Sequence, residues 1–473
     1  MRIKLWTWRY APIVLITILA ATIRLYNLAH LMPFIGDQAW FFLSARDSLA
    51  EGTIPLVGIT ASRTWLHQGP FWSYILMILF SFGGFDPIIA GYLTALTGVL
   101  AVVAIYLVLQ SMHDTQAAVI GAFLYATSPL VILSDRMPYH TTFTPLIMIG
   151  VYWTLWMIMQ GRKRLLPLLV GLIAIMQNTN IAGFPIVYVI VGLIGYGYVT
   201  GKSWLRNIQK KTLLYSIFIW LLLMMPSIIY DGMSGHGYPQ TIHFYGWLVV
   251  QPVLAVFSTG HSSLMPILQF LVLTIQRLIF LPSAHVSIFI LAGSLLYSLR
   301  HIFQKKNRHL TPLTYSLIWT LSMLLIVTVG KTPSQAYVYT LYPLIIILCA
   351  QVCGSILTHE TKRAWLLYVL IFTLGSINCV SLVRSNYLMG TAGGYGAPFV
   401  ERKKLAETIV AQSEGKPYSL KVVGPGEQFT STGMYMEYLT WLLGHPPTAG
   451  AKKTFEIYEK DGKLQMRSFE LLQ

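Results

Sequence analysis

The chain has 473 residues, of which 55% are apolar and only 11% charged, whereas roughly a quarter of the residues in an ordinary soluble domain are charged. This composition excludes a soluble globular protein and indicates an integral membrane protein. The net charge of +16 does not indicate a nucleic-acid-binding protein, because the excess falls before residue 389, where 23 Lys and Arg face 8 acids, as in a bundle oriented by short basic loops.

Apolar runs of about 20 residues recur along the first 388 residues, and each is long enough to cross a hydrocarbon core as a helix. The alternating pattern of barrel strands is absent, so we expect helical spans. The first run follows a basic arm, as in a signal sequence, but we expect it to remain uncleaved. The sequence therefore predicts about eleven transmembrane helices near residues 11–31, 88–110, 116–133, 141–160, 165–180, 182–200, 212–230, 285–300, 313–330, 336–357 and 364–383.

With these spans, 16 of the 23 basic residues before residue 389 fall on one side of the membrane, which the positive-inside rule makes cytoplasmic. Residues 70–84 and 245–280 are also apolar. Counting 70–84 as a crossing would place the basic run at 162–164 outside, so we expect both segments to be helices in the outer interface or dipping back from it. Six of the eight acids then face outward, namely Asp37, Asp47, Glu51, Asp86, Asp135 and Asp231.

The composition changes near residue 389, where a glycine-rich stretch predicts a flexible link. Helical patterns at 400–412 and 431–444 alternate with strand patterns at 418–424 and 453–460. We therefore predict two domains, a transmembrane domain over residues 1–388 and a small soluble extracytoplasmic α/β domain over residues 389–473. The predicted fold class is a mostly α, polytopic helix bundle with interfacial helices and this small domain.

The first outer loop, residues 32–69, carries a carboxylate, Asp37, near its start at the outer bilayer surface. An ionised carboxylate there can act as a base on a group arriving from water, or can face a lipid head group. It can equally be a solvated loop acid, or can anchor the N-terminus of the following helix, where the helix dipole favours negative charge. Position alone leaves these alternatives open.

Several segments resemble the GT-C superfamily of membrane glycosyltransferases, which use polyprenyl-phosphate sugars, in the branch of the protein O-mannosyltransferases and the lipid A aminoarabinose transferase. Arg24 lies near the end of the first span, and the similarity then runs in order over most of residues 20–350. The segments that carry it are GDQAWFFLSARDSLAEG (36–52), HQGPFWSYIL (67–76), TSPLVILSDRMPYHTTFTPLI (127–147), PSIIYDGMSGHGYPQT (226–241) and KTPSQAYVYTLYPLIIIL (331–348).

The resemblance implies that Asp37 is the catalytic aspartate of the first outer loop. The family often has Asp-Glu here, whereas this chain has Asp37-Gln38, so we expect a second acid from elsewhere and favour Asp135. The family's basic residue before the Pro of the interfacial helix corresponds to His67 or Arg63.

Sugar transfer from a lipid phosphate needs a base for the acceptor hydroxyl and cations for the leaving phosphate. Asp37 fits the first role. Arg136 could instead be an interfacial anchor, and Lys331 a snorkelling side chain at the end of a span. An ionisable group at the depth of Arg24 usually has a partner or a role, and orienting Asp37 is one such role. The candidate substrate-binding cations are Arg24, Arg63, His67, Arg136 and Lys331.

No metal-ligand or nucleotide-binding motif stands out. Asp231, His236 and His243 share one loop, but their spacing is not a recognised ligand pattern. No cofactor is therefore assigned, although a divalent cation is compatible with the chemistry. The predicted partners are a polyprenyl-phosphate sugar donor, a glycan, lipid or protein acceptor and membrane lipids, with no nucleic acid.

The predicted function is an inverting membrane glycosyltransferase that moves a sugar from a polyprenyl-phosphate donor to an extracytoplasmic acceptor hydroxyl. The predicted location is the plasma membrane, in the manner of a bacterial inner membrane, since no eukaryotic retention signal or N-glycosylation acceptor site appears. The main alternative is a polytopic transporter or lipid flippase without covalent chemistry, although no paired halves are apparent. A non-catalytic scaffold is a third reading.

Overall fold

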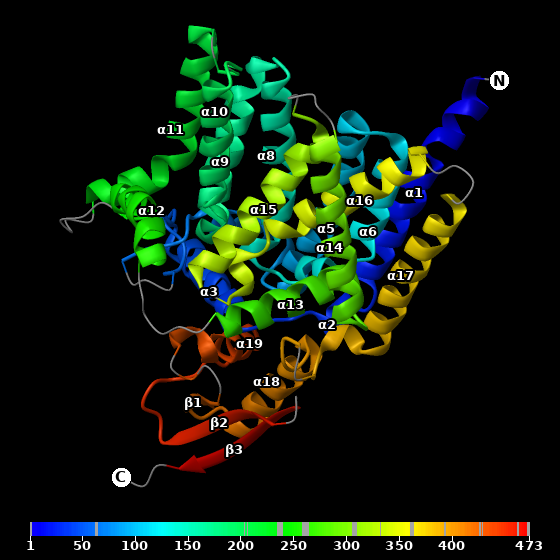
Figure 1. Cartoon of the computed structure of the whole chain (residues 1–473). Helices are drawn as coiled ribbons and strands as arrows, with labels where there is room; N and C mark the ends of the chain where they lie inside the picture. The colour runs from blue at the N-terminus through cyan, green and yellow to red at the C-terminus, as the bar shows by residue number, and fades with distance from the viewer. Residues whose placement is uncertain are drawn as a thin grey trace.

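The computed structural model describes residues 2–470 except 62–64, 203, 206, 234–239, 258–263, 305–309, 332, 360–363, 392–393, 425–426, 428 and 461–462. The predicted fold class is confirmed, because a large helix bundle carries a small domain with a three-stranded sheet at its C-terminal end. In Figure 1 the bundle fills the upper part of the view, and the sheet lies below it beside the C-terminus.

Each of the eleven predicted spans coincides with a helix or helix pair. Eight described helices are long and apolar enough to cross a membrane, or nine if the bent pair α6/α7 is one span; α9 has only 14 residues. The chain is thus a multi-pass membrane protein. The bundle helices are α1 (Arg2–Leu25), α5 (Pro87–Met112), α6 (Thr115–Ala126), α7 (Pro129–Asp135), α8 (Thr144–Met159), α9 (Leu166–Thr179), α10 (Ile186–Val199), α11 (Lys210–Met233), α14 (Ala284–Gln304), α15 (Pro312–Gly330), α16 (Leu341–His359) and α17 (Ala364–Arg384).

The bend between α6 and α7 is 62°, and its cause is visible in the sequence. Pro129 disfavours the helical region for the residue before it, and Ser128 has extended backbone angles (φ −71°, ψ 118°). The Ser128 hydroxyl donates to the carbonyl of Leu278 at 2.7 Å, which ties the break to a neighbouring helix.

Five further helices precede or interrupt the bundle; of these, α2, α3 and α13 lie at the end of the bundle that faces the small domain, and α12 lies along its flank (Figure 1). The segment 70–84 forms α4, whose 13 residues span only about 20 Å and cannot cross a bilayer core. The other apolar segment, 245–280, is covered by two helices of 18 and 15 residues. The five are α2 (Leu28–Leu31), α3 (Gly36–Glu51), α4 (Phe71–Gly83), α12 (Gln240–Phe257) and α13 (Met265–Ile279).

The C-terminal part contains the predicted helices and strands. They are α18 (Phe399–Ser413), β1 (Tyr418–Val423), α19 (Met434–Leu442), β2 (Lys453–Lys460) and β3 (Lys463–Glu470). β1 pairs with β2 in parallel, as a strand-helix-strand unit requires, and β2 pairs with β3 antiparallel. The domain boundary at residue 389 stays a prediction. Short 3₁₀ turns connect the elements at η1 (His140–Phe143), η2 (Lys163–Leu165), η3 (Ile181–Gly183), η4 (Gln335–Tyr337), η6 (Asn386–Leu388) and η7 (Thr430–Gly433).

The small domain and the first outer loop share one apolar core. The ring of Phe34 lies 5.8 Å from Phe399 and 5.9 Å from Tyr438, measured between centroids. The Tyr438 hydroxyl also donates to the carbonyl of Phe85 at 2.6 Å. Aromatic contacts of this kind add to the area they bury, so the small domain is docked on α3 and α4 by packing as well as by the chain connection.

Candidate active site

Asp37 lies in the first turn of α3. The Gln38 side chain accepts a hydrogen bond from the backbone N–H of Ile35 at 3.0 Å and so caps the helix. Gln38 is therefore used for helix capping where the family often has a second acid. Gln38 and Ala39 are buried, whereas Asp37 is exposed. The Asp37 carboxylate is therefore accessible at the start of α3, while its two neighbours pack inside the protein.

Asp37 lines a cavity of about 600 Å³. Polar groups gather around it from segments that are distant in sequence. They are Tyr139, His140, Thr141, Asn180, Gln68 and Ser334. A ligand placed beside the Asp37 carboxylate would thus meet hydroxyl, amide and imidazole groups that can bond to a sugar.

The same cavity has an apolar wall from α12 and α15. Met323, Ile326 and Val327 line it, and their spacing places them on one face of α15. Trp247 and Leu248 of α12 complete the wall. The cavity therefore joins an exposed carboxylate to a surface suited to a hydrocarbon chain.

The charge of Asp37 acts on one cavity tyrosine. Burial raises the pKa of the Tyr139 hydroxyl well above its usual value, and the nearby negative charge of Asp37 raises it further. Tyr139 therefore stays protonated and can donate a hydrogen bond in the cavity. Oδ1 of Asp37 accepts a hydrogen bond from the Ser431 hydroxyl of the small domain at 2.5 Å.

Arg24 and Asp135 are bonded to each other. Nε of Arg24 lies 2.7 Å from Oδ2 of Asp135, and both side chains are buried. Arg24 also donates to the carbonyls of Ala20 and Ala126 at 3.3 and 3.1 Å, so the pair joins α1 to α6 and α7. Neither residue is among the described groups that line the cavity at Asp37, and their predicted roles in catalysis stay predictions.

Arg136 directly follows α7, and its buried side chain reaches the C-terminal end of α1. It donates to the carbonyls of Arg24 and Tyr26 at 2.7 and 2.8 Å. Its guanidinium carbon lies 3.8 Å above the centre of the Tyr387 ring, a cation–π arrangement. These contacts join α1 to the turn η6 that precedes the small domain, while the predicted role of Arg136 in phosphate binding stays a prediction.

Lys331 directly follows α15 in a left-handed conformation (φ 49°). Gly330 before it and Ser334 after it both line the cavity, so Lys331 lies at the cavity rim. Arg63 falls outside the described residues.

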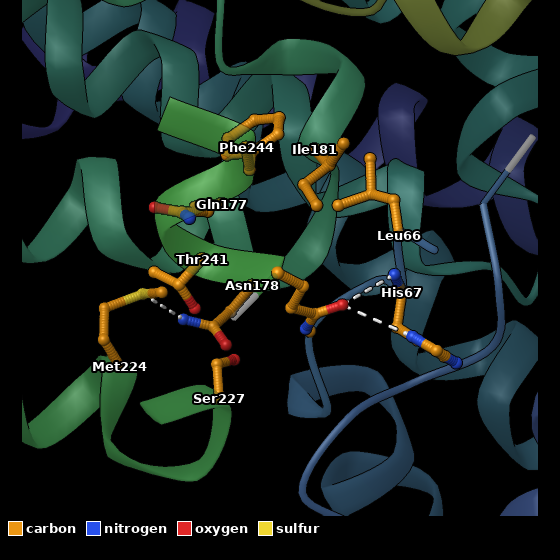
Figure 2. A pocket seen from close by; sticks show the side chains of 11 residues that line it. Leu66, His67, Gln177, Asn178, Ile181, Met224, Ser227, Thr241 and Phe244 are labelled. Carbon is orange, nitrogen blue, oxygen red and sulfur yellow. Dashed lines mark hydrogen bonds between the residues drawn. The ribbon is translucent and has the colours of Figure 1, made fainter. Parts of the chain in front are cut away.

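His67 lies in a smaller polar pocket of about 20 Å³ beside the main cavity (Figure 2). Oε1 of Gln240 accepts from the backbone N–H of His67 at 3.0 Å and lies 3.3 Å from its ring Nδ1. Leu66 and Ile181 line both cavities. Burial lowers the pKa of His67, although the Gln240 hydrogen bond opposes this, so His67 is neutral at neutral pH and suits hydrogen bonding better than charge pairing.

Several groups in the cavity or bonded to Asp37 carry no strong sequence signal. Tyr139, His140 and Thr141 fall inside a motif quoted for the resemblance, but a short polar run at the start of a span is common. His140 is nearly fully buried and its Nδ1 has no partner among the described residues. Ser431 is 394 positions from Asp37, and nothing local connects the two.

Within the described ranges, no three His, Cys, Asp or Glu side chains lie close enough to hold a metal ion. Asp231 accepts from the backbone N–H groups of Gln240 and Thr241 at 2.9 and 3.0 Å, so it caps the start of α12. His243 packs against Trp65, and His236 lies outside the described residues.

No protein-family model matches the sequence, and no curated protein matches it either. Solved structures do match over nearly the whole chain. ArnT from Cupriavidus metallidurans bound to undecaprenyl phosphate matches with a TM-score of 0.64 at 11% identity, and the match covers 98% of each chain.

Two structures of the Archaeoglobus fulgidus oligosaccharyltransferase also match. The complex with Zn and sulfate gives a TM-score of 0.60 at 15% identity, covering 91% of this chain but only 61% of the other. AglB in complex with an inhibitory peptide and a dolichol-phosphate gives 0.59 at 13% identity, covering 95% and 69%. The resemblance predicted from the sequence is therefore confirmed at the level of architecture, since the chain shares its fold with ArnT and with the archaeal oligosaccharyltransferase.

Proposed function

We propose that the protein is a membrane glycosyltransferase that takes a sugar from a polyprenyl-phosphate donor and transfers it to an acceptor hydroxyl. The observation that carries the proposal is the cavity of about 600 Å³ at which the exposed Asp37 meets the apolar wall of α12 and α15. A lipid-linked sugar needs both surfaces at once. The fold is also that of ArnT and AglB, whose structures contain undecaprenyl phosphate and dolichol-phosphate.

In the proposed reaction Asp37 is the general base. Its carboxylate takes the proton of the acceptor hydroxyl, and the acceptor oxygen forms a bond to the anomeric carbon of the sugar. The bond from that carbon to the phosphate oxygen breaks, and its electron pair leaves with the polyprenyl phosphate. Because attack and departure take place on opposite faces in a single displacement, the anomeric configuration inverts.

The leaving phosphate gains negative charge, which a fixed cation stabilises. We assign this role to Lys331, because its neighbours Gly330 and Ser334 line the cavity. Tyr139 and Asn180 can bond to sugar hydroxyls from the same cavity. The neutral His67 would contribute a hydrogen bond through its ring.

The orientation follows from the basic loops. The positive-inside rule makes the side with the basic clusters, including residues 162–164, cytoplasmic. Asp37 and the small domain fall on the other side of the predicted spans, so we propose that they are extracytoplasmic. The membrane is proposed to be a bacterial plasma membrane, with a glycan, lipid or protein acceptor. A flippase, the alternative, would move lipid without consuming donor.

The test is sugar transfer by the purified protein from a panel of radiolabelled polyprenyl-phosphate sugars. Asp37→Asn should abolish transfer while leaving expression and membrane insertion intact. The matched control is Asp47→Asn, which changes an exposed acid of the same helix that pairs with Arg46 and should retain transfer. Unchanged turnover in Asp37→Asn would reject the assignment.

A further inference from the structure

The small domain reaches Asp37 through one side chain. Ser431 lies in η7, the turn that precedes α19, and its hydroxyl donates to Oδ1 of Asp37 at 2.5 Å. The bond joins two groups that are 394 residues apart in the chain. Asp37 therefore has a hydrogen-bond donor that belongs to neither the first outer loop nor the transmembrane bundle.

The backbone around this contact is closely fitted. A side chain at Gly36 would place its Cβ only 1.9 Å from the carbonyl oxygen of Ser431, so only glycine allows η7 to approach α3 this closely. Ser431 is 7% exposed. Because α19 packs its Tyr438 on Phe42 of α3, with ring centroids 5.5 Å apart, the turn is held against α3 by the core on its C-terminal side.

The two oxygens of Asp37 therefore differ. Oδ1 is occupied by the buried hydroxyl of Ser431, whereas the residue as a whole is exposed and lines the cavity. A hydrogen bond to an ionised carboxylate is short and directional. It restricts rotation of the carboxylate and leaves the second oxygen to take a proton from a bound hydroxyl.

We propose that Ser431 is a positioning residue for Asp37, so that the small domain completes the catalytic centre of the glycosyltransferase. This inference rests on the proposed function, in which Asp37 is the base. It assigns to the small domain a part in the chemical step.

The test compares Ser431→Ala, Ser431→Thr and wild type in the transfer assay, with kcat and donor KM measured separately. Loss of a hydrogen bond to a charged group predicts a kcat lower by about tenfold to a hundredfold. Donor KM should stay unchanged, because Ser431 bonds to the base and not to the phosphate. Ser431→Thr retains the hydroxyl and should restore most of kcat.

A matched control is Ser419→Ala in β1 of the same domain. Its hydroxyl bonds to the carbonyl of Thr448 and to the N–H of Ala451 at 2.9 and 3.0 Å, so its removal should leave kcat close to wild type. The contact itself is measured without activity by a thermal-unfolding cycle of Ser431→Ala, Asp37→Ala and the double variant. Bonded partners predict that the double variant loses less than the sum of the single losses.

The outcomes separate the two proposals. A lower kcat with unchanged KM, rescue by Thr and non-additive unfolding support the positioning role. Full kcat in Ser431→Ala, or strictly additive unfolding, overturns it while the proposed function stands if Asp37→Asn is inactive. Absence of transfer by the wild type with every donor rejects the proposed function, and the positioning role falls with it.

Discussion

The buried pair of Arg24 and Asp135 gives a prediction that separates a structural from a catalytic role. Asp135→Ala removes the carboxylate bonded to Arg24, whose Nε lies 2.7 Å from Oδ2. Removing one partner of a buried ion pair costs about 3–5 kcal/mol, because the remaining charge is left uncompensated. Arg24 keeps three backbone carbonyls at 3.1–3.4 Å, which places the expected loss near the lower end, at about 3 kcal/mol.

The assay is thermal unfolding of the detergent-purified protein, together with transfer activity expressed per folded molecule. Asp135→Ala should lower Tm by several degrees and leave the activity of the folded fraction largely intact. The double variant Arg24→Met with Asp135→Ala removes both charges and should recover much of the lost stability, since apolar replacements of a whole buried pair are often close to neutral.

The reasoning is refuted if Asp135→Ala unfolds at the wild-type temperature and yet transfers no sugar. That result would make Asp135 the second acid that the family resemblance suggests. A double variant less stable than Asp135→Ala would also contradict the account, because it would show that the Arg24 charge is stabilising without its partner.

Three further predictions concern the cavity wall, its rim and the small domain. Val327→Trp places a bulky side chain at the apolar wall of the cavity and should raise donor KM. The control Leu325→Trp changes a position that is 62% exposed on another face of α15 and should leave donor KM unchanged. Equal effects in both variants would contradict the proposed path of the lipid tail. Lys331→Ala should lower kcat/KM about tenfold to a hundredfold, with partial recovery in Lys331→Arg, and unchanged kcat/KM in Lys331→Ala would remove it from the phosphate site. Burial raises the pKa of Glu437, and the nearby charge of Arg46 opposes this. The contribution of Glu437 to stability is therefore greatest at acid pH and is lost as pH rises through the folded-state pKa. Glu437→Gln should raise Tm at neutral pH but not at acid pH, and a gain in Tm independent of pH would contradict this cause.

The elements of the fold could be predicted from the sequence because hydropathy acts locally. An apolar run of about 20 residues specifies a membrane helix whatever surrounds it, and each predicted span coincides with a helix or helix pair. The segment 70–84 could be predicted not to cross the membrane, because a crossing there would place the basic run at 162–164 outside. The strand and helix patterns after residue 389 were strong because their periodicity changes between two and 3.6 residues.

The site could be predicted only where one short segment defines it. Asp37 follows a span and begins a capped helix, and both features are local. The bond between Arg24 and Asp135 joins residues 111 positions apart, and sequence shows two charges near span ends without showing that they meet. Ser431 carries even less signal, since a serine before a helix is ordinarily interpreted as a cap.

The most direct test of the central claim is a structure of the protein with a polyprenyl-phosphate donor bound. The account predicts the sugar beside the Asp37 carboxylate, the phosphate next to Lys331 at the rim, and the prenyl chain along Met323 and Val327 of α15. A donor whose phosphate lies away from Asp37, or whose chain leaves the protein without touching α12 or α15, would contradict it.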